Sequence, residues 1–197
     1  FVFCCFNQNN KITPNIFDIW MRILKTVDKS ILWLLEDDSI AVKNLRKEAK
    51  KRKIDPKRII FAKRMPLADH FARHKCADLF IDTFPYGAHT TCSDSLWAGL
   101  PIVTLMGKSF ASRVASSLLN AINLEELVTS TEKEYEKLII ELANNSYRLK
   151  EIRNKLHKNR STKPLFDTKL YTKNIELAYT KIYEKHLNKL PTKNIEI

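Results

Sequence analysis

Residues 82–101, which read DTFPYGAHTTCSDSLWAGLP, decide the fold of this chain. The apolar run at 77–81 precedes them and predicts a buried strand. A Pro/Gly turn follows, and the hydroxyl pair Thr90 and Thr91 then opens a segment with helical spacing that ends at Gly99. In an open α/β sheet, ligands bind beyond the carboxyl ends of the strands. Because the free N–H groups at a helix N-terminus attract anions, this strand, loop and helix predict a phosphate-binding site.

Strands and helices alternate on both sides of this stretch. Apolar runs predict further strands at 1–6, 31–35, 58–61 and 102–105, and helical spacing predicts helices at about 14–27, 39–53, 67–75 and 111–122. Only helical spacing follows residue 130. The pattern predicts an α/β fold with a doubly wound parallel sheet over residues 1–129. A C-terminal helical extension over 130–197 is expected to pack on the same lobe.

The composition is that of an ordinary globular protein, with 197 residues of which 44% are hydrophobic and 28% charged. No apolar run approaches the roughly 18 to 20 residues of a membrane span, and no signal-peptide pattern is present. We therefore expect no membrane partner and a cytoplasmic location. The chain opens with Phe1 in an apolar run, which predicts a fragment of a longer protein. Cys4, Cys5, Cys76 and Cys92 form no C-x-x-C pair and are predicted to be free thiols.

The formal net charge of +12 is concentrated near the C-terminus, where residues 146–197 hold 13 Lys or Arg and 5 Asp or Glu. A basic chain is compatible with a nucleic-acid partner. These charges, however, are spread along helical faces and are not interleaved with exposed aromatic residues. The distribution favours a solvated face, or a surface that docks on an acidic domain, over nucleic-acid binding.

Phosphate would have to be held without a glycine-rich fingerprint, because neither G-x-G-x-x-G nor a Walker-A sequence is present. Three other candidates lie where strands feed helices. They are the helix opening at Thr90 and Thr91, the helix opening near Ser109 with Arg113, and Lys11 in the first strand-to-helix turn. All three belong to the carboxyl edge of the predicted sheet.

Each candidate also has a purely structural interpretation. Thr91 and Asp94 fit a capping box that satisfies backbone donors, although Asp94 could instead bind a ribose diol. His89 suits a diphosphate oxygen but is a lone loop histidine. The remaining candidates are either ligand-binding or simply exposed: Gln8 and Lys11 in a polar turn, and His70 and Arg73 on one face of a short helix. No D-x-D motif stands at a strand end, so we expect no metal, and no Ser/His/Asp or Cys/His arrangement is suggested.

The same residues resemble a known family. The motif formed by residues 82–86, His89, Thr90, Thr91, Asp94, 96–99 and Pro101 is similar to the C-terminal catalytic lobe of the O-linked N-acetylglucosamine transferase and SPINDLY-like family, glycosyltransferase family 41. The resemblance extends in order over 6–8 with Lys11, 31–35, 58–61, 111–115, and 164–166 with Tyr171. It implies a GT-B architecture, with residues 1–129 as the Rossmann-like lobe that binds a nucleotide sugar.

The resemblance also implies roles for single residues. Lys11 would be the catalytic residue and would neutralise the leaving nucleotide. The diphosphate would be contacted by Gln8 and cradled by His89, Thr90 and Thr91. The ribose would be bound by Asp94, and His70 and Arg73 would lie by the base. Two positions depart from the family pattern. Leu67 stands where animal members have a lysine near the ribose. Tyr86 occupies a position that lies close to the donor sugar and holds a smaller residue in animal enzymes, so the identity of the donor sugar stays open.

The function implied is that of an inverting, metal-independent glycosyltransferase that moves a sugar, GlcNAc or a related one, to a protein Ser or Thr. A UDP-sugar would be the donor substrate, with no cofactor. The N-terminal catalytic lobe and tetratricopeptide repeats of the family would precede Phe1, so this chain would carry half of the catalytic unit. The alternative is a non-catalytic module that binds nucleotide sugars or docks a partner through its basic C-terminal helices.

Overall fold

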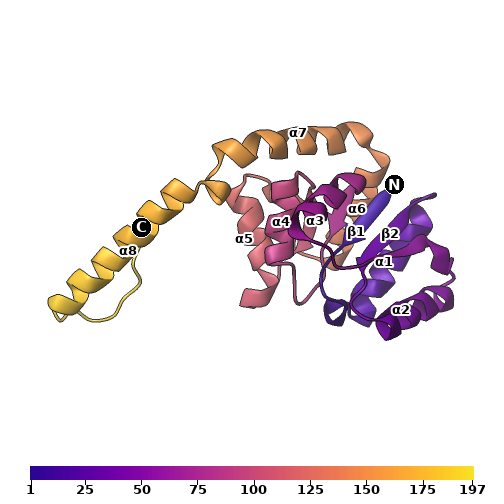
Figure 1. Ribbon diagram of the computed structural model, residues 1–197, viewed down its shortest axis with the longest axis horizontal. Helices are drawn as coiled ribbons and strands as arrows, with labels where there is room; N and C mark the ends of the chain where they lie inside the picture. The colour runs from indigo at the N-terminus through magenta and orange to yellow at the C-terminus, as the bar shows by residue number, and fades with distance from the viewer.

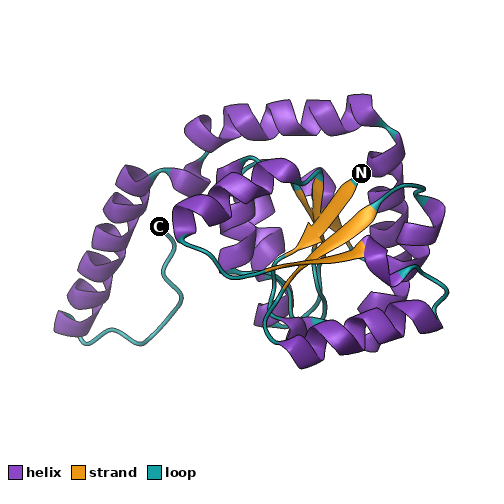
Figure 2. Ribbon diagram, turned by 45° about the vertical axis from the view of Figure 1, so that its right-hand side comes forward, coloured by secondary structure: helices purple, strands orange, loops and turns teal.

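The computed structural model describes all 197 residues and contains one six-stranded sheet with helices on both of its faces (Figures 1 and 2). The strands are β1 Val2–Cys5, β2 Ile31–Leu35, β3 Ile59–Ala62, β4 Leu79–Ile81, β5 Ile102–Leu105 and β6 Val128–Thr129. Their order across the sheet is β3-β2-β1-β4-β5-β6, and every neighbouring pair is parallel. The predicted doubly wound parallel sheet is therefore confirmed, and the direction of winding reverses between β1 and β4.

The chain contains eight α-helices. They are α1 Pro14–Thr26, α2 Ser39–Lys51, α3 Leu67–Arg73, α4 Thr90–Ala98, α5 Val114–Ala121, α6 Glu132–Asn144, α7 Ser146–Thr162 and α8 Thr168–Leu187. Short 3-10 turns lie between them: η1 Asn9–Lys11, η2 Pro56–Arg58, η3 His74–Cys76, η4 Phe110–Ser112, η5 Glu125–Leu127 and η6 Pro164–Phe166. No helix has both the length and the apolar character needed to cross a membrane.

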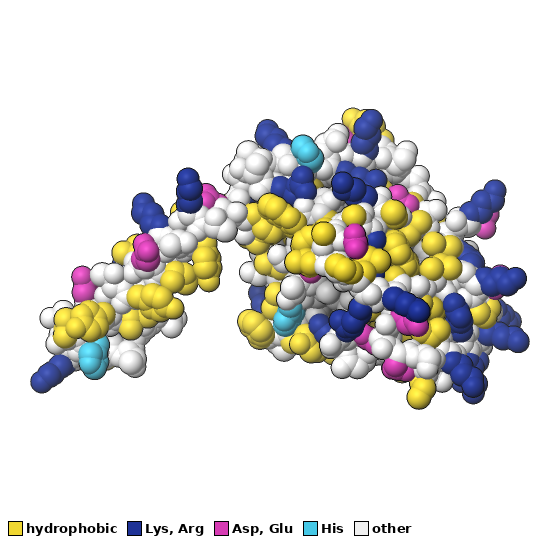
Figure 3. Space-filling view, viewed as in Figure 1, with side chains coloured by type: hydrophobic (Ala, Val, Ile, Leu, Met, Phe, Trp, Pro, Cys, Tyr) yellow, Lys and Arg dark blue, Asp and Glu magenta, His cyan; other side chains and the backbone are white.

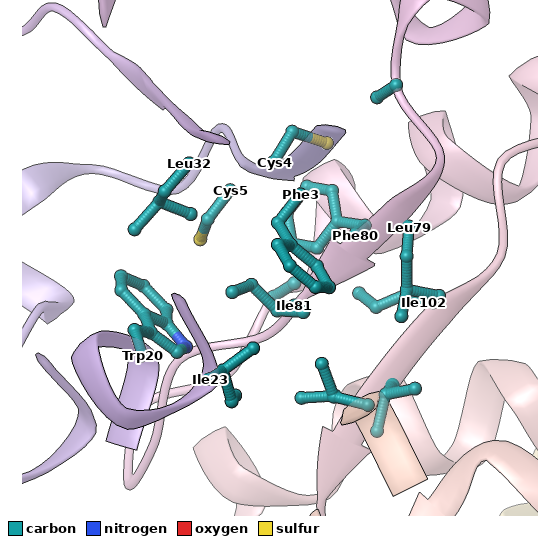
Figure 4. Packing of buried hydrophobic residues seen from close by; sticks show 14 of the residues in the cluster. Phe3, Cys4, Cys5, Trp20, Ile23, Leu32, Leu79, Phe80, Ile81 and Ile102 are labelled. Carbon is teal, nitrogen blue, oxygen red and sulfur yellow. The ribbon is translucent and has the colours of Figure 1, made fainter. Parts of the chain in front are cut away.

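The core forms where α1 packs on the central strands. Trp20 and Ile23 of α1 have no exposed surface and lie against apolar side chains of β1, β2 and β4, as Figure 4 shows. Burying an apolar side chain of this size contributes about 1.5–3 kcal/mol. The Trp20 indole donates to the Tyr135 hydroxyl of α6 at 3.2 Å, and that hydroxyl donates to the Asp82 carbonyl at 2.7 Å. The end of β4 is thus anchored to two helices.

The sixth strand was not predicted from the sequence. β6 contains only Val128 and Thr129, which pair with Thr104 and Leu105 of β5. Two residues are too few to show a period, and the pairing depends on β5, which lies more than 20 residues earlier. The predicted helix at 111–122 also begins later, because η4 occupies its first turn and α5 starts at Val114.

The last three helices differ in how they contact the lobe. α6 and α7 bury apolar side chains on it, and Arg153 and Lys155 of α7 pair with Asp78 at 3.3 Å and Glu126 at 2.8 Å. α8 buries none of its residues and projects away from the lobe in Figure 1. Apolar side chains are exposed along it, as Figure 3 shows.

Candidate functional site

The candidate site lies at the reversal between β1 and β4, where the turn after β1 meets the loop after β4. Two adjoining cavities of about 340 Å³ and 330 Å³ open there and share Phe6, Leu35, Arg64 and Thr91 in their walls. The first is lined by Gln8, Lys11, Tyr86, His89, Thr90 and Thr91, and the second by His70, Arg73 and Asp94. The fold therefore brings nine of the residues predicted from the sequence to one continuous cleft, which we call the switch-point cleft.

Lys11 lines the first cavity. Its ammonium donates to the Gly87 carbonyl at 3.0 Å and stands 3.7 Å from the centroid of the Tyr86 ring. Burial lowers the pKa of Lys11, while the nearby carboxylate of Asp82 acts in the opposite direction. No carboxylate forms an ion pair with this ammonium, so its charge is available to an anion in the cleft.

The N-terminus of α4 faces the same cavity without a side-chain cap. His89 is the N-cap residue and makes no capping hydrogen bond, so the capping box considered for Thr91 and Asp94 is wrong. The backbone N–H groups of Thr90 and Thr91 have no hydrogen-bond partner. The Thr91 hydroxyl donates instead to the Asn7 side-chain oxygen. Thr91 can therefore offer an anion its backbone N–H, whereas its hydroxyl proton is already engaged.

His89 is oriented by a neighbouring loop. Its Nε2 lies 3.3 Å from the Ala111 carbonyl, which can only accept, so Nε2 carries a proton. The ring lies between Tyr86 and Phe110, with centroids 5.2 Å and 5.8 Å away. The Nε2 donor of His89 is thus given to the protein.

The second cavity combines an aromatic wall with two nitrogen-bearing side chains. The Arg73 guanidinium lies 4.3 Å from the centroid of Phe6 and donates to the Lys63 carbonyl at 2.8 Å, while its Nε has no partner. Burial, together with the charge of Arg73, lowers the pKa of His70 to about 4, so this imidazole is neutral at pH 7. Burial also raises the pKa of Asp94. A flat, uncharged group with polar edges would suit this cavity.

Sequence reasoning missed Arg64, which lines both cavities and pairs with Asp37 at 2.8 Å. Its place just after β3, at the carboxyl edge of the sheet, is the signal that could have identified it. Conversely, Arg113 lies outside the switch-point cleft. It donates to the Gly107 carbonyl at 3.1 Å and lines a larger cavity of about 580 Å³ along α5. We place the site at the smaller cavities because the free cation and the unpaired N–H groups converge there.

Comparison with known proteins decides the family. The model of glycosyl transferase family 41 matches residues 1–175. The chain belongs to this family. The UDP-N-acetylglucosamine--peptide N-acetylglucosaminyltransferase of Caenorhabditis elegans is 38% identical over 98% of the chain, and the probable enzyme of this name called SEC in Arabidopsis thaliana is 38% identical over 94%. The chain spans 17% and 19% of the length of these two proteins.

One solved structure agrees with this family 41 assignment, and another shares the fold. An O-GlcNAc transferase variant from Thermobaculum terrenum superposes with a TM-score of 0.87 at 30% identity, over 92% of this chain and 36% of that one. Anabaena HepE in complex with UDP shares the fold at a TM-score of 0.62 and 15% identity, over 93% of this chain and 49% of that one. The resemblance and the GT-B-type Rossmann-like lobe predicted from the sequence are both confirmed.

Proposed function

We propose that this family 41 chain is the donor-binding part of an inverting, metal-independent glycosyltransferase. It would take a UDP-sugar, with GlcNAc or a related sugar, and serve its transfer to a protein Ser or Thr hydroxyl. The single observation that carries the proposal is the convergence of the Lys11 ammonium and the unpaired N–H groups of Thr90 and Thr91 at the switch-point cleft. The names of the relatives, which are peptide N-acetylglucosaminyltransferases, support the reaction class.

The two cavities divide the donor between them. The diphosphate occupies the first, where Lys11 and the N-terminus of α4 supply positive potential and the Gln8 amide can donate a hydrogen bond. When the bond from sugar to phosphate breaks, negative charge grows on the diphosphate, and donors already held in place stabilise it without reorganising. In this assignment Lys11 neutralises the leaving group, and His89 lies beside the phosphates in the same cavity wall.

The nucleoside occupies the second cavity. The neutral His70 and the planar Arg73 guanidinium flank an uncharged base, and Asp94 accepts hydrogen bonds from the ribose hydroxyls. Leu67, which is 61% exposed, lines this cavity and offers no cation to the ribose. Tyr86 stands at the opposite end, beside Lys11, where we place the choice of donor sugar.

The general base and the acceptor-binding surface are proposed to lie in parts of the enzyme outside these 197 residues. The chain spans less than a fifth of the named relatives, which leaves room for the N-terminal catalytic lobe and repeats expected from the resemblance. The partners of this lobe would then be a nucleotide sugar and a protein or peptide acceptor.

Thermal unfolding of the chain with added UDP tests the proposal directly. UDP at 100 times its dissociation constant stabilises the folded state by about 2.7 kcal/mol, which raises the melting temperature by roughly 5–10 °C for a domain of this size. The absence of a shift with millimolar UDP or GDP would refute a competent donor lobe. Transfer from UDP-GlcNAc to a Ser/Thr peptide by the full-length enzyme separates an active transferase from a binding module.

A further inference from the structure

Asp82 is a buried carboxylate that the proposed chemistry leaves unused. It directly follows β4, has no exposed surface and lines neither cavity of the switch-point cleft. Its Oδ1 accepts from Asn7 Nδ2 at 3.1 Å and from the N–H groups of Thr83 and Ala88, both at 2.8 Å. Its Oδ2 accepts from the Thr104 hydroxyl at 2.7 Å. A buried carboxylate is tolerated only when donors surround it, and here they come from the turn after β1, from β5 and from the loop after β4.

One of these bonds controls the loop that holds Lys11. The Ala88 N–H on Asp82 fixes the chain one residue before the N-cap of α4. The preceding residue, Gly87, lies so close that an added Cβ would stand 3.0 Å from Asp82 Oδ2. The Gly87 N–H donates to the Ala111 carbonyl at 3.0 Å, and the Gly87 carbonyl accepts from Lys11 at 3.0 Å. The carboxylate therefore sets the position of the peptide on which the Lys11 ammonium rests.

A second bond controls the first turn of α4. Asn7 donates its amide hydrogens to Asp82 and to the Thr83 hydroxyl, at 3.1 Å and 2.8 Å. Its side-chain oxygen is consequently directed toward α4, where it accepts from the Thr91 hydroxyl. This chain of hydrogen bonds ties the end of β1 to the helix N-terminus that carries the unpaired N–H groups.

We propose that Asp82 is a positioning residue whose hydrogen bonds, through Ala88 and Asn7, hold Lys11 and the N-terminus of α4 in register for a nucleoside diphosphate. The inference rests on the proposed function, since it takes that ligand class as given. It predicts that loss of the carboxylate weakens binding of the second phosphate more than binding of the nucleoside monophosphate.

Two substitutions of one residue separate positioning from charge. In Asp82→Ala every hydrogen bond is lost, and calorimetric titration should show UDP bound about tenfold more weakly but UMP by less than about threefold. In Asp82→Asn the amide oxygen still accepts at Oδ1 and the amide nitrogen can donate to the Thr104 hydroxyl. UDP affinity should then return to within about threefold of the original chain.

Asn159→Ala is the matched control, because Asn159 is also buried and donates to the Ile122 carbonyl at 2.7 Å far from the cleft. It should lower the melting temperature and leave the affinities for UDP and UMP unchanged. Asp82→Ala with UDP affinity within about twofold of the original chain would overturn the inference. So would Asp82→Asn binding as weakly as Asp82→Ala, since charge would then be the cause.

If Asp82→Ala does not fold, Thr104→Val decides, because it removes one donor and keeps the side-chain volume. UDP should bind about threefold more weakly with UMP unchanged, and equal UDP affinity would contradict the positioning role. Failure of the original chain to bind UDP would refute the proposed function itself. If the original chain binds UDP and substitution of Asp82 leaves the UDP affinity unchanged, only the positioning role of Asp82 is refuted.

Discussion

Replacement of Lys11 by Met should remove the main attraction between the switch-point cleft and a diphosphate. Methionine preserves the apolar stem beside the Tyr86 ring, so the change is chiefly one of charge. Two unit charges about 4 Å apart attract by about 4 kcal/mol at an effective dielectric constant of about 20. Lys11 is only partly buried, and it also loses water when the diphosphate binds, so we expect about 2–3 kcal/mol in binding.

That loss corresponds to UDP binding about 30- to 150-fold more weakly, which titration calorimetry measures directly. Lys133→Met is the matched control, because Lys133 is exposed on α6 and pairs with no carboxylate. It should bind UDP as the original chain does. In the full-length enzyme, Lys11→Met should abolish sugar transfer. A Lys11→Met chain that binds UDP within about threefold of the original would exclude Lys11 from the diphosphate site.

Three other substitutions test separate parts of the structure. Tyr86→Ala removes a cation–π contact worth about 0.5–1 kcal/mol, so UDP should bind about two- to fivefold more weakly. In the full-length enzyme, the ratio of kcat/KM for UDP-GlcNAc to kcat/KM for UDP-glucose should also change. An unchanged ratio would show that Tyr86 does not select the donor sugar. Tyr135→Phe leaves the Trp20 N–H and the Asp82 carbonyl unpaired, so urea unfolding should show a loss of about 2–4 kcal/mol, and less than 1 kcal/mol would contradict that pairing. Burial raises the pKa of Asp82 to about 6, above its value in the unfolded chain. The free energy of unfolding of the original chain, relative to that of Asp82→Asn, should therefore fall as pH rises from about 4 to 6 and stay constant above about pH 6. Urea unfolding at about pH 4 and at about pH 6 measures the direction of this change.

The α/β alternation could be predicted because the central strands are continuous apolar runs. Residues 31–35 and 102–105 are covered on both faces by helices, so nearly every position is apolar and the runs are visible without alignment. β6 could not be found in this way, since its two residues become a strand only by pairing with β5. The late start of α5 has a similar cause: the Gly107 N–H donates to the Ser112 carbonyl at 3.1 Å and the Ser112 hydroxyl donates to the Ser109 carbonyl at 2.9 Å, and these bonds hold the preceding turn, which is a 3-10 helix.

The members of the site could be predicted because the carboxyl edge of a parallel sheet collects whatever follows each strand. Lys11 follows β1 and His89 follows β4, and these strands are neighbours although Lys11 and the Gly87 carbonyl that it contacts are 76 positions apart in the sequence. The state of each group could not be predicted. The Thr91 hydroxyl donates to Asn7, which lies in the turn after β1 and 84 positions away in the sequence, and no local spacing encodes that contact.

Asp82 shows why a carboxylate can lie beneath a site for anions. Its charge alone disfavours a diphosphate, but it also opposes the effect of burial on the pKa of Lys11 and so helps to keep that ammonium charged. The negative charge is buried and surrounded by four donors, whereas the positive charge reaches the cavity wall. A ligand in the cleft therefore meets the cation and the helix N-terminus first. The free-energy cost of burying one carboxylate is offset because the Lys11 ammonium and the N–H groups at the N-terminus of α4 are already in position when the diphosphate binds.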